Sequence, residues 1–244
     1  MEQENPSSWA IRCEGLKKSF GEQHALRGVD LTVARGECLA VFGPNGAGKT
    51  TLIKVLCTMS RPSGGGAWID GLDIRKAPNE IRRKLGVVSH ATFLYGNLTP
   101  AENLRFYGKM YDVPNLENRI EEVLDQVHLR SRIHDRVSTL SRGMQQRVAI
   151  ARSIIHNPSI MLMDEPETGL DPHATIMMRD ILDSINSGDR TVVVTTHDLG
   201  RGLELGDRMA ILHKGRVVFE APKAEIDAGR IHELYDEHTR AVVR

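Results

Sequence analysis

One segment of eight residues has the composition and spacing of a loop that holds phosphate groups. It consists of Gly43, Pro44, Asn45, Gly46, Ala47, Gly48, Lys49 and Thr50, which match the pattern GxxxxGK[ST]. The segment lies between an apolar stretch that ends at Phe42 and a helical pattern from Lys49 to Thr58. Glycines let backbone N–H groups converge on phosphate oxygens, and the following helix presents its positive N-terminal end. We therefore expect Lys49 to reach the β and γ phosphates of a nucleotide, Thr50 to bind Mg²⁺ and Thr51 to line the same loop.

Two neighbouring carboxylates follow a second apolar stretch, Ile160 to Met163. Strand ends of this kind are where α/β folds place their ligands. We expect Asp164 to hold Mg²⁺, partly through water, and Glu165 to orient and deprotonate an attacking water. By itself the pair could equally be the polar end of an ordinary strand, but the phosphate loop upstream favours the catalytic interpretation.

A histidine follows the next apolar stretch in the same way. His197 comes directly after the segment TVVVTT, so it too is expected at the carboxyl end of a strand. An imidazole there can contact a γ-phosphate or position water. A single histidine is more often structural, and the argument for His197 is its order in the chain after the phosphate loop and the acidic pair.

The surrounding patterns indicate an α/β fold. Strands are expected on either side of the turn at Ala34–Gly36, at 67–69, at 160–163, at 191–195 and in a hairpin over 208–213 and 216–219. The stretch from Pro100 to His156 is predicted to be helical, and a further helix is expected from Pro172 to Ile185. Strands that alternate with helices are typical of a covered parallel sheet.

Composition narrows the class of protein. The chain has 244 residues, 32 basic and 32 acidic residues and a formal net charge of zero, so no basic field for nucleic acid is expected. Three dispersed cysteines fit a reducing compartment better than a disulfide scaffold. No apolar run approaches the ~20 residues of a membrane-spanning helix, so membrane association is expected to require a partner.

A third motif identifies a family. The segment Leu140 to Arg147, LSRGMQQR, resembles the LSGGQ signature of ATP-binding cassette (ABC) transporter subunits, with Arg142 and Met144 in place of the usual Gly and Gln. Independently of that resemblance, Ser141 and the Gly143 backbone at a helix start could form an anion site. Ser141 could also be a simple N-cap, an interpretation that would prevail for this segment alone.

The resemblance extends over essentially the whole chain and implies a fold. This is an α/β fold of the P-loop ABC type, with a mixed sheet core, an N-terminal antiparallel β subdomain and an inserted helical subdomain. We expect one domain over 1–244, with a nucleotide-binding core at 11–89 and 157–220, a helical subdomain at 90–156 and a helical C-terminal extension at 221–244.

The resemblance also implies cofactors, partners and further site residues. ATP and Mg²⁺ would be sandwiched between two cassettes, with Ser141 and Gly143 of one covering the γ-phosphate held by the other, so the expected partner is a second copy of the chain. Phe20 would stack on adenine, with a core aromatic as its alternative, and Asp171 in TGLD would belong to the loop that communicates across the dimer.

One departure from the family pattern concerns the site itself. Most members carry a Gln that reaches Mg²⁺ and the attacking water where this chain has His90. Because Mg²⁺ prefers oxygen ligands, we expect His90 to act through water or on the γ-phosphate instead. The run from His90 to Tyr107 resembles the haem-exporter subunit of cytochrome c maturation, although its LTxxENL portion is widespread among cassettes.

These observations predict an ATPase that drives an exporter through separate integral membrane subunits, from the cytoplasmic face of the inner membrane, with haem as the expected cargo. The alternative is an ABC-2 type exporter of drugs, ions or polysaccharide. A soluble cassette ATPase is less favoured because the chain has neither a second cassette nor a sustained heptad pattern. The interpretation of the chain as a kinase or GTPase would leave the signature segment unexplained.

Overall fold

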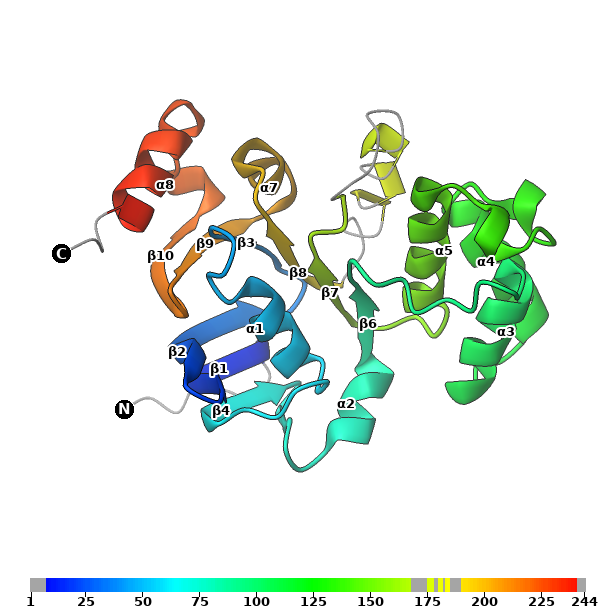
Figure 1. The fold of residues 1–244 in the computed structure, drawn as a ribbon, viewed down its shortest axis with the longest axis horizontal. Coiled ribbons are helices and arrows are strands. Elements are labelled where there is room, and N and C mark those ends of the chain that lie inside the picture. The colour runs from blue at the N-terminus through cyan, green and yellow to red at the C-terminus, as the bar shows by residue number, and fades with distance from the viewer. Residues whose placement is uncertain (1–7, 168–174, 178–179, 182, 185–189, 241–244) are drawn as a thin grey trace.

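Two β-sheets and a set of helices make up the structure, a computed structural model that describes residues 8–167, 175–177, 180–181, 183–184 and 190–240 (Figure 1). The larger sheet has the strand order β10-β9-β3-β8-β7-β6. Its strands are β3 (Cys38–Phe42), β6 (Leu85–Val88), β7 (Ile160–Asp164), β8 (Thr191–Thr196), β9 (Arg208–His213) and β10 (Arg216–Pro222). All neighbouring strands are parallel except β9 and β10, which form an antiparallel hairpin.

The smaller sheet is antiparallel, with the order β2-β1-β4-β5. It consists of β1 (Trp9–Phe20), β2 (Gln23–Ala34), β4 (Gly64–Ile69) and β5 (Leu72–Asp73). Buried and exposed residues alternate along much of β2, as expected for a sheet with one covered face.

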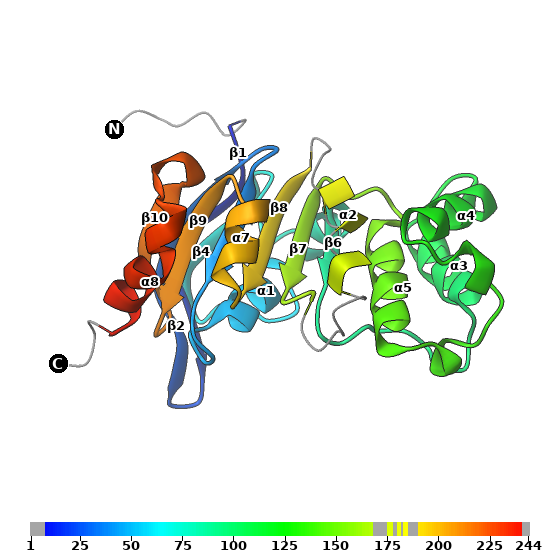
Figure 2. The ribbon, with the colours of Figure 1, turned by 90° about the horizontal axis from the view of Figure 1, so that it is seen from above.

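The helices are α1 (Lys49–Leu56), α2 (Pro78–Lys84), α3 (Pro100–Met110), α4 (Leu116–Gln126), α5 (Arg142–Ile154), α7 (Leu199–Leu205) and α8 (Ile231–Arg240). Helices α3, α4 and α5 gather at one end of the molecule, beside β6 (Figures 1 and 2). Helix α7 covers one face of the six-stranded sheet in Figure 2. The buried side chains form two clusters, which receive alternate residues of the central strand β3. Leu39 and Val41 face α1 and the small sheet, whereas Ala40 and Phe42 face the other cluster.

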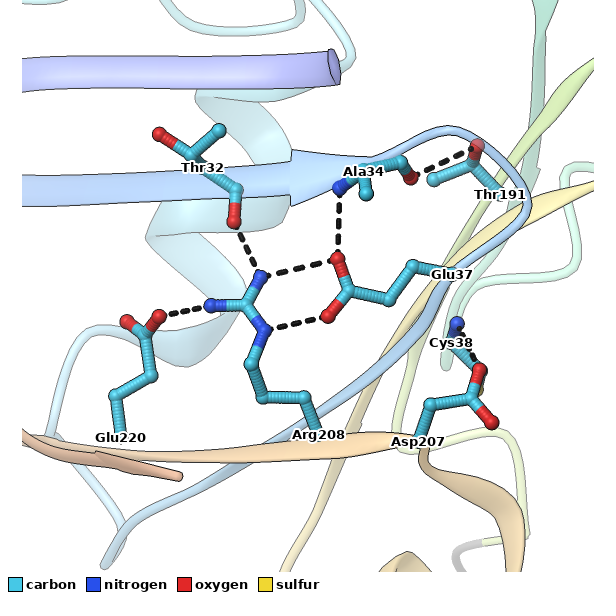
Figure 3. Close-up of polar contacts among 8 residues, drawn as sticks. All are labelled: Thr32, Ala34, Glu37, Cys38, Thr191, Asp207, Arg208 and Glu220. Atoms are coloured by element: carbon cyan, nitrogen blue, oxygen red, sulfur yellow. Dashed lines mark hydrogen bonds and ion pairs between the residues drawn. The ribbon is translucent and has the colours of Figure 1, made fainter. Parts of the chain in front are cut away.

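A partly buried arginine ties the two sheets together (Figure 3). Arg208, at the start of β9, binds Glu37 with two nitrogens, Glu220 on β10 and the backbone oxygen of Thr32 on β2. Glu37 also accepts a hydrogen bond of 2.6 Å from the backbone N–H of Ala34. The network therefore fixes the small sheet against the strand that leads into the phosphate loop.

Several expectations from the sequence need correction. The stretch from 221 is not helical at its start, because β10 continues to Pro222 and two short 3-10 turns precede α8. Non-helical segments and two short 3-10 turns divide the predicted helical region 100–156 into three α-helices. Half of the predicted helix at 172–185 lies outside the described residues, and the described ones, 175–177, 180–181 and 183–184, are helical. Strand β1 was not identified by pattern, because Lys17 and Lys18 interrupt its alternation.

Candidate nucleotide site

The predicted phosphate loop connects the buried strand β3 to α1, as the motif requires. Only glycine fits at Gly48, where φ is +112° and a Cβ atom would lie 2.7 Å from the backbone oxygen of Ala25. Gly46 has φ +80°, and a Cβ atom added there would have no neighbour within 4 Å, so its backbone is open to approach by a ligand. The local fold is therefore set by glycines whose positions the motif predicts.

Lys49 is held among backbone carbonyls of this loop. Its side chain is 5% exposed, and Nζ donates to the backbone oxygens of Gly43 at 2.7 Å and Pro44 at 3.4 Å. The same nitrogen lies 3.3 Å from Oε1 of Glu165. The ammonium group thus stands between the loop and the acidic end of β7.

The acidic pair is positioned by a threonine on the neighbouring strand. Asp164 ends β7, is 7% exposed and accepts a hydrogen bond of 2.8 Å from Oγ1 of Thr195. The backbone N–H of Glu165 donates to the backbone oxygen of Thr195 at 3.1 Å and to its Oγ1 at 3.2 Å. Glu165 has φ +48°, an uncommon conformation for a residue with a side chain, which these bonds stabilise.

The Glu165 carboxylate lies between a lysine and a histidine. Its Oε1 is 3.3 Å from Lys49 Nζ, and its Oε2 is 3.6 Å from Nδ1 of His197. His197 directly follows β8 and is 64% exposed, whereas the Glu165 side chain is 24% exposed. The structure therefore brings together the cation at the start of α1 and, from the ends of β7 and β8, the carboxylate and the imidazole that the sequence singled out.

A cavity opens at the phosphate loop. It is lined by Gln23, His24 and Ala25 of β2, by the loop and helix residues 44–51, which include Thr50 and Thr51, and by Glu165. Phe20 pairs with Gln23 across the β1–β2 hairpin and is 52% exposed. The alternative interpretation of Phe20 as an aromatic residue of the core is therefore wrong. Lys18 Nζ lies 4.6 Å from the centre of its ring.

The signature segment does not reach this cavity. Ser141 caps α5 by accepting a hydrogen bond of 3.3 Å from the backbone N–H of Met144, and Gly143 is buried in the first turn. His90 follows β6 and contacts Arg142. None of these residues, which come from the helical end of the molecule, lines the cavity at the loop. Asp171, the remaining predicted site residue, lies outside the described residues.

Sequence reasoning missed Thr195 and the lining segment 23–25. Thr195 pairs with Asp164 across β7 and β8, and nothing in the sequence distinguishes it from the other two threonines of β8, Thr191 and Thr196. Residues 23–25 gave no signal, because they are distant from the loop in sequence and meet it only in the fold, where the backbone oxygen of Ala25 faces Gly48.

The donor set fits Mg²⁺ bound together with a nucleotide. The hydroxyl of Thr50 and the carboxylate of Asp164 are oxygen donors, and Mg²⁺ in nucleotide sites is held by one or two protein oxygens, phosphates and water. Within the described residues no cluster of three or more His, Cys, Asp or Glu side chains could hold a metal by itself. Phosphate oxygens and water would supply the remaining ligands of the ion.

Residues 26–168 match the family model for the ABC transporter domain. The ABC transporter ATP-binding protein NatA of Bacillus subtilis is 34% identical over 87% of this chain and 84% of its own. A Nod factor export ATP-binding protein of Rhizobium sp. is 35% identical over 95% of this chain and 74% of its own. A daunorubicin resistance ATP-binding protein of Streptomyces coeruleorubidus is 35% identical over 90% and 70%, respectively.

Solved structures agree with the fold. A bacterial ABC transporter cassette solved as a dimer is 30% identical, matches 87% of this chain and 98% of its own, and superposes with a TM-score of 0.80. The P-loop fold with a mixed sheet and an antiparallel sheet, as expected from the sequence, is confirmed. In the described part of the chain, no helix combines the length and apolar composition needed to cross a membrane.

Proposed function

Because this chain belongs to the ABC transporter family and is an ATPase of that family, we propose that it energises an exporter by hydrolysing ATP between two copies of itself. The observation that carries the proposal is the position of the Glu165 carboxylate at the mouth of the phosphate loop, between Lys49 Nζ and His197 Nδ1. The base, the cation that would neutralise phosphate and the imidazole therefore lie next to one another.

Each residue has a distinct task in the proposed reaction. The loop amides and Lys49 neutralise the phosphates, and Glu165 orients a water and accepts its proton. His197, which already contacts Glu165, holds the γ-phosphate or that water. Thr50 and Asp164 hold Mg²⁺, which when bound supplies positive charge to the phosphate oxygens. Phe20, exposed beside Gln23, stacks on adenine.

A second copy of the chain completes the site. Ser141 and the first-turn amides of α5, including that of Gly143, face no nucleotide of their own chain, because the cavity at the loop is lined by other residues. The positive end of a 13-residue helix is suited to a γ-phosphate held by the partner. Related cassettes have been solved as dimers, which supports this assembly.

The membrane partner is proposed to dock in a groove between the core and the helical end of the molecule. This docking groove is lined by Cys57, Met59, Arg82, Leu85, Val87, Phe93, Tyr107, Tyr111, Arg152, Ser153 and His156. Met59 and Phe93 are 58% and 44% exposed, and none of the described residues that line the groove is acidic. An apolar segment with an acidic residue, on the cytoplasmic side of an integral membrane subunit, would match both features.

The class of cargo that we propose is based on the names of the relatives and not on the resemblance to haem exporters. Their names include Nod factor export and daunorubicin resistance, and these names give the haem-exporter expectation no support. We therefore propose the alternative, an ABC-2 type exporter of drugs, ions or polysaccharide, with the chain bound to the cytoplasmic face of the membrane through its partner.

Affinity purification from detergent-solubilised membranes tests this proposal. The tagged chain should recover an integral membrane transport protein, identified by mass spectrometry. Met59→Glu, which places a charge in the docking groove, should lose that partner. Met110→Glu, at an equally exposed methionine outside the groove, should keep it. Recovery of no membrane protein contradicts the coupling proposal, and recovery of cytochrome-maturation subunits contradicts the cargo class.

A further inference from the structure

A largely buried ion pair joins the two segments that carry the Glu165 carboxylate and the His197 imidazole. Arg201 lies in the first turn of α7, four residues after His197, and Glu167 lies two residues after Glu165. Nε of Arg201 donates a hydrogen bond of 3.0 Å to Oε1 of Glu167. The Arg201 side chain is 5% exposed and that of Glu167 is 18% exposed, so salt and water screen this pair little.

Three carboxylates fix the orientation of the Arg201 guanidinium. Besides the bond from Nε to Glu167, Nη1 donates to Glu204 at 3.2 Å and Nη2 donates to Asp183 at 3.3 Å. The backbone N–H of Arg201 donates to Oδ1 of Asp198, the N-cap of α7, at 3.0 Å. Burial by itself lowers the pKa of Arg201, but Glu167 and the other carboxylates bound to the guanidinium raise it above its ordinary value. The arginine therefore presents a charged and oriented group to Glu167.

The segment that carries His197 holds the Glu165 segment at a second point. Oγ1 of Thr195, two residues before His197, accepts a hydrogen bond of 3.2 Å from the backbone N–H of Glu165. Arg201 binds Glu167 on the other side of Glu165. Between these two points Glu165 has φ +48°, a conformation that persists only where the surrounding structure imposes it. The two contacts therefore restrain the backbone on both sides of this carboxylate.

Two cavities adjoin the carboxylate that these contacts restrain. Glu165, Glu167, His197 and Arg201 all line one cavity beside β8 and α7. Of these four residues, Glu165 alone also lines the cavity at the phosphate loop. Close packing cannot restrain a side chain where it faces open space. The position of the Glu165 carboxylate therefore depends on the ion pairs and hydrogen bonds of its segment.

We infer that Arg201, acting on Glu167, is a positioning residue that sets the Glu165 carboxylate against His197, whose Nδ1 lies 3.6 Å from Oε2 of Glu165. The inference rests on the proposed function, in which Glu165 orients the attacking water. Arg201 itself contacts neither the nucleotide nor that water and acts only through the segment that carries Glu165. Its removal displaces the base, and a misplacement of about 1 Å lowers a rate by up to about 100-fold.

Steady-state ATPase kinetics below the melting temperature of every variant test the inference. Arg201→Met and Glu167→Met should each lower kcat at least about tenfold and change KM for ATP less than about twofold, because the phosphate loop is intact. The matched control is Glu204→Met, which removes a 62% exposed carboxylate from the same arginine and should change kcat less than about twofold. An unchanged kcat in Arg201→Met, or equal losses in Glu167→Met and Glu204→Met, overturns the inference.

A double variant separates positioning from stability. Glu167→Gln added to Arg201→Met removes the unpaired charge but does not restore the ion pair. The melting temperature should therefore rise relative to Arg201→Met, while kcat stays as low as in that variant. If kcat recovers together with the melting temperature, Arg201 acts on stability alone and the inference is wrong.

A measurement without turnover separates the inference from the proposed function. In ¹H–¹³C spectra of the full-length chain with labelled histidine, the His197 ring signal, assigned with His197→Gln, should shift in Arg201→Met and stay in place in Glu204→Met. A His197 signal that does not respond to Arg201→Met overturns the inference. An unmodified chain without ATPase activity contradicts the proposed function instead, while the spectra still test the ion pair.

Discussion

Removal of one buried arginine should destabilise the segment that carries Glu165. The Arg201 side chain in α7 is 5% exposed and binds Glu167 at 3.0 Å, Glu204 at 3.2 Å and Asp183 at 3.3 Å. Glu167 is two residues beyond Glu165, and its side chain is 18% exposed. Arg201→Met keeps much of the side-chain volume but leaves Glu167 largely buried without a cation.

The magnitude follows from the burial of the three carboxylates. Glu204 and Asp183 are 62% and 59% exposed, so each contributes at most about 1 kcal/mol. Breaking a buried pair by removing one partner costs about 3–5 kcal/mol, and the partial exposure of Glu167 lowers this toward 2–4 kcal/mol. For a chain of this size, about 2–4 °C in Tm accompanies each kcal/mol, so we expect a decrease of roughly 5–15 °C.

Thermal unfolding followed by circular dichroism measures this effect. Adding Glu167→Gln to Arg201→Met should recover about half of the loss, because the unpaired charge is removed. The control is Arg230→Met, since Arg230 and its partner Glu233 are 74% and 72% exposed and the change should be within about 2 °C. An Arg201→Met chain that melts within about 2 °C of the unmodified protein refutes this account of the Glu165 segment.

Two further changes test the fold around the site. Burial lowers the pKa of His156 from 6.5 to about 4, so the unfolded chain binds this proton more tightly between those values. Above pH 6.5 His156 is neutral in both states and its protonation does not reduce stability. As the pH falls toward 4, protonation of the unfolded chain lowers the free energy of unfolding, by roughly 1–2 kcal/mol at pH 5. Urea unfolding at several pH values should show a shallower decline for His156→Phe, and identical slopes would contradict the burial argument. Gly202→Ala would place a Cβ atom 2.1 Å from Cζ of the buried Phe42, so we expect a loss of about 1–3 kcal/mol. Gly200→Ala in the same helix, whose nearest atom is 3.5 Å away, should be neutral or stabilising, and equal effects of the two substitutions would exclude a steric cause.

The parts of the site that were predictable depend on local sequence. The phosphate loop follows from glycine conformation and a flanking strand and helix, and the positions of Glu165 and His197 follow from the apolar strands that precede them. Parallel strands end at one edge of the sheet, so their proximity was also predictable.

The parts that were missed depend on contacts between distant residues. Arg208 and Glu37 are 171 residues apart, and Arg201 and Glu167 are 34 apart. Neither pair has a local pattern that distinguishes it from ordinary surface charges. His90 and Arg142 were each noticed as departures from the family pattern, but only the structure shows that they touch.

The oligomeric state of Glu165→Gln with ATP tests the central claim most directly. If Glu165 activates water and Ser141 covers the partner's nucleotide, this variant should bind ATP, lose most turnover and accumulate as a dimer in analytical ultracentrifugation. Ser141→Arg added to it should return the chain to a monomer, because the side chain blocks the helix start. A Glu165→Gln chain that remains monomeric with ATP and hydrolyses it at the normal rate would contradict both assignments.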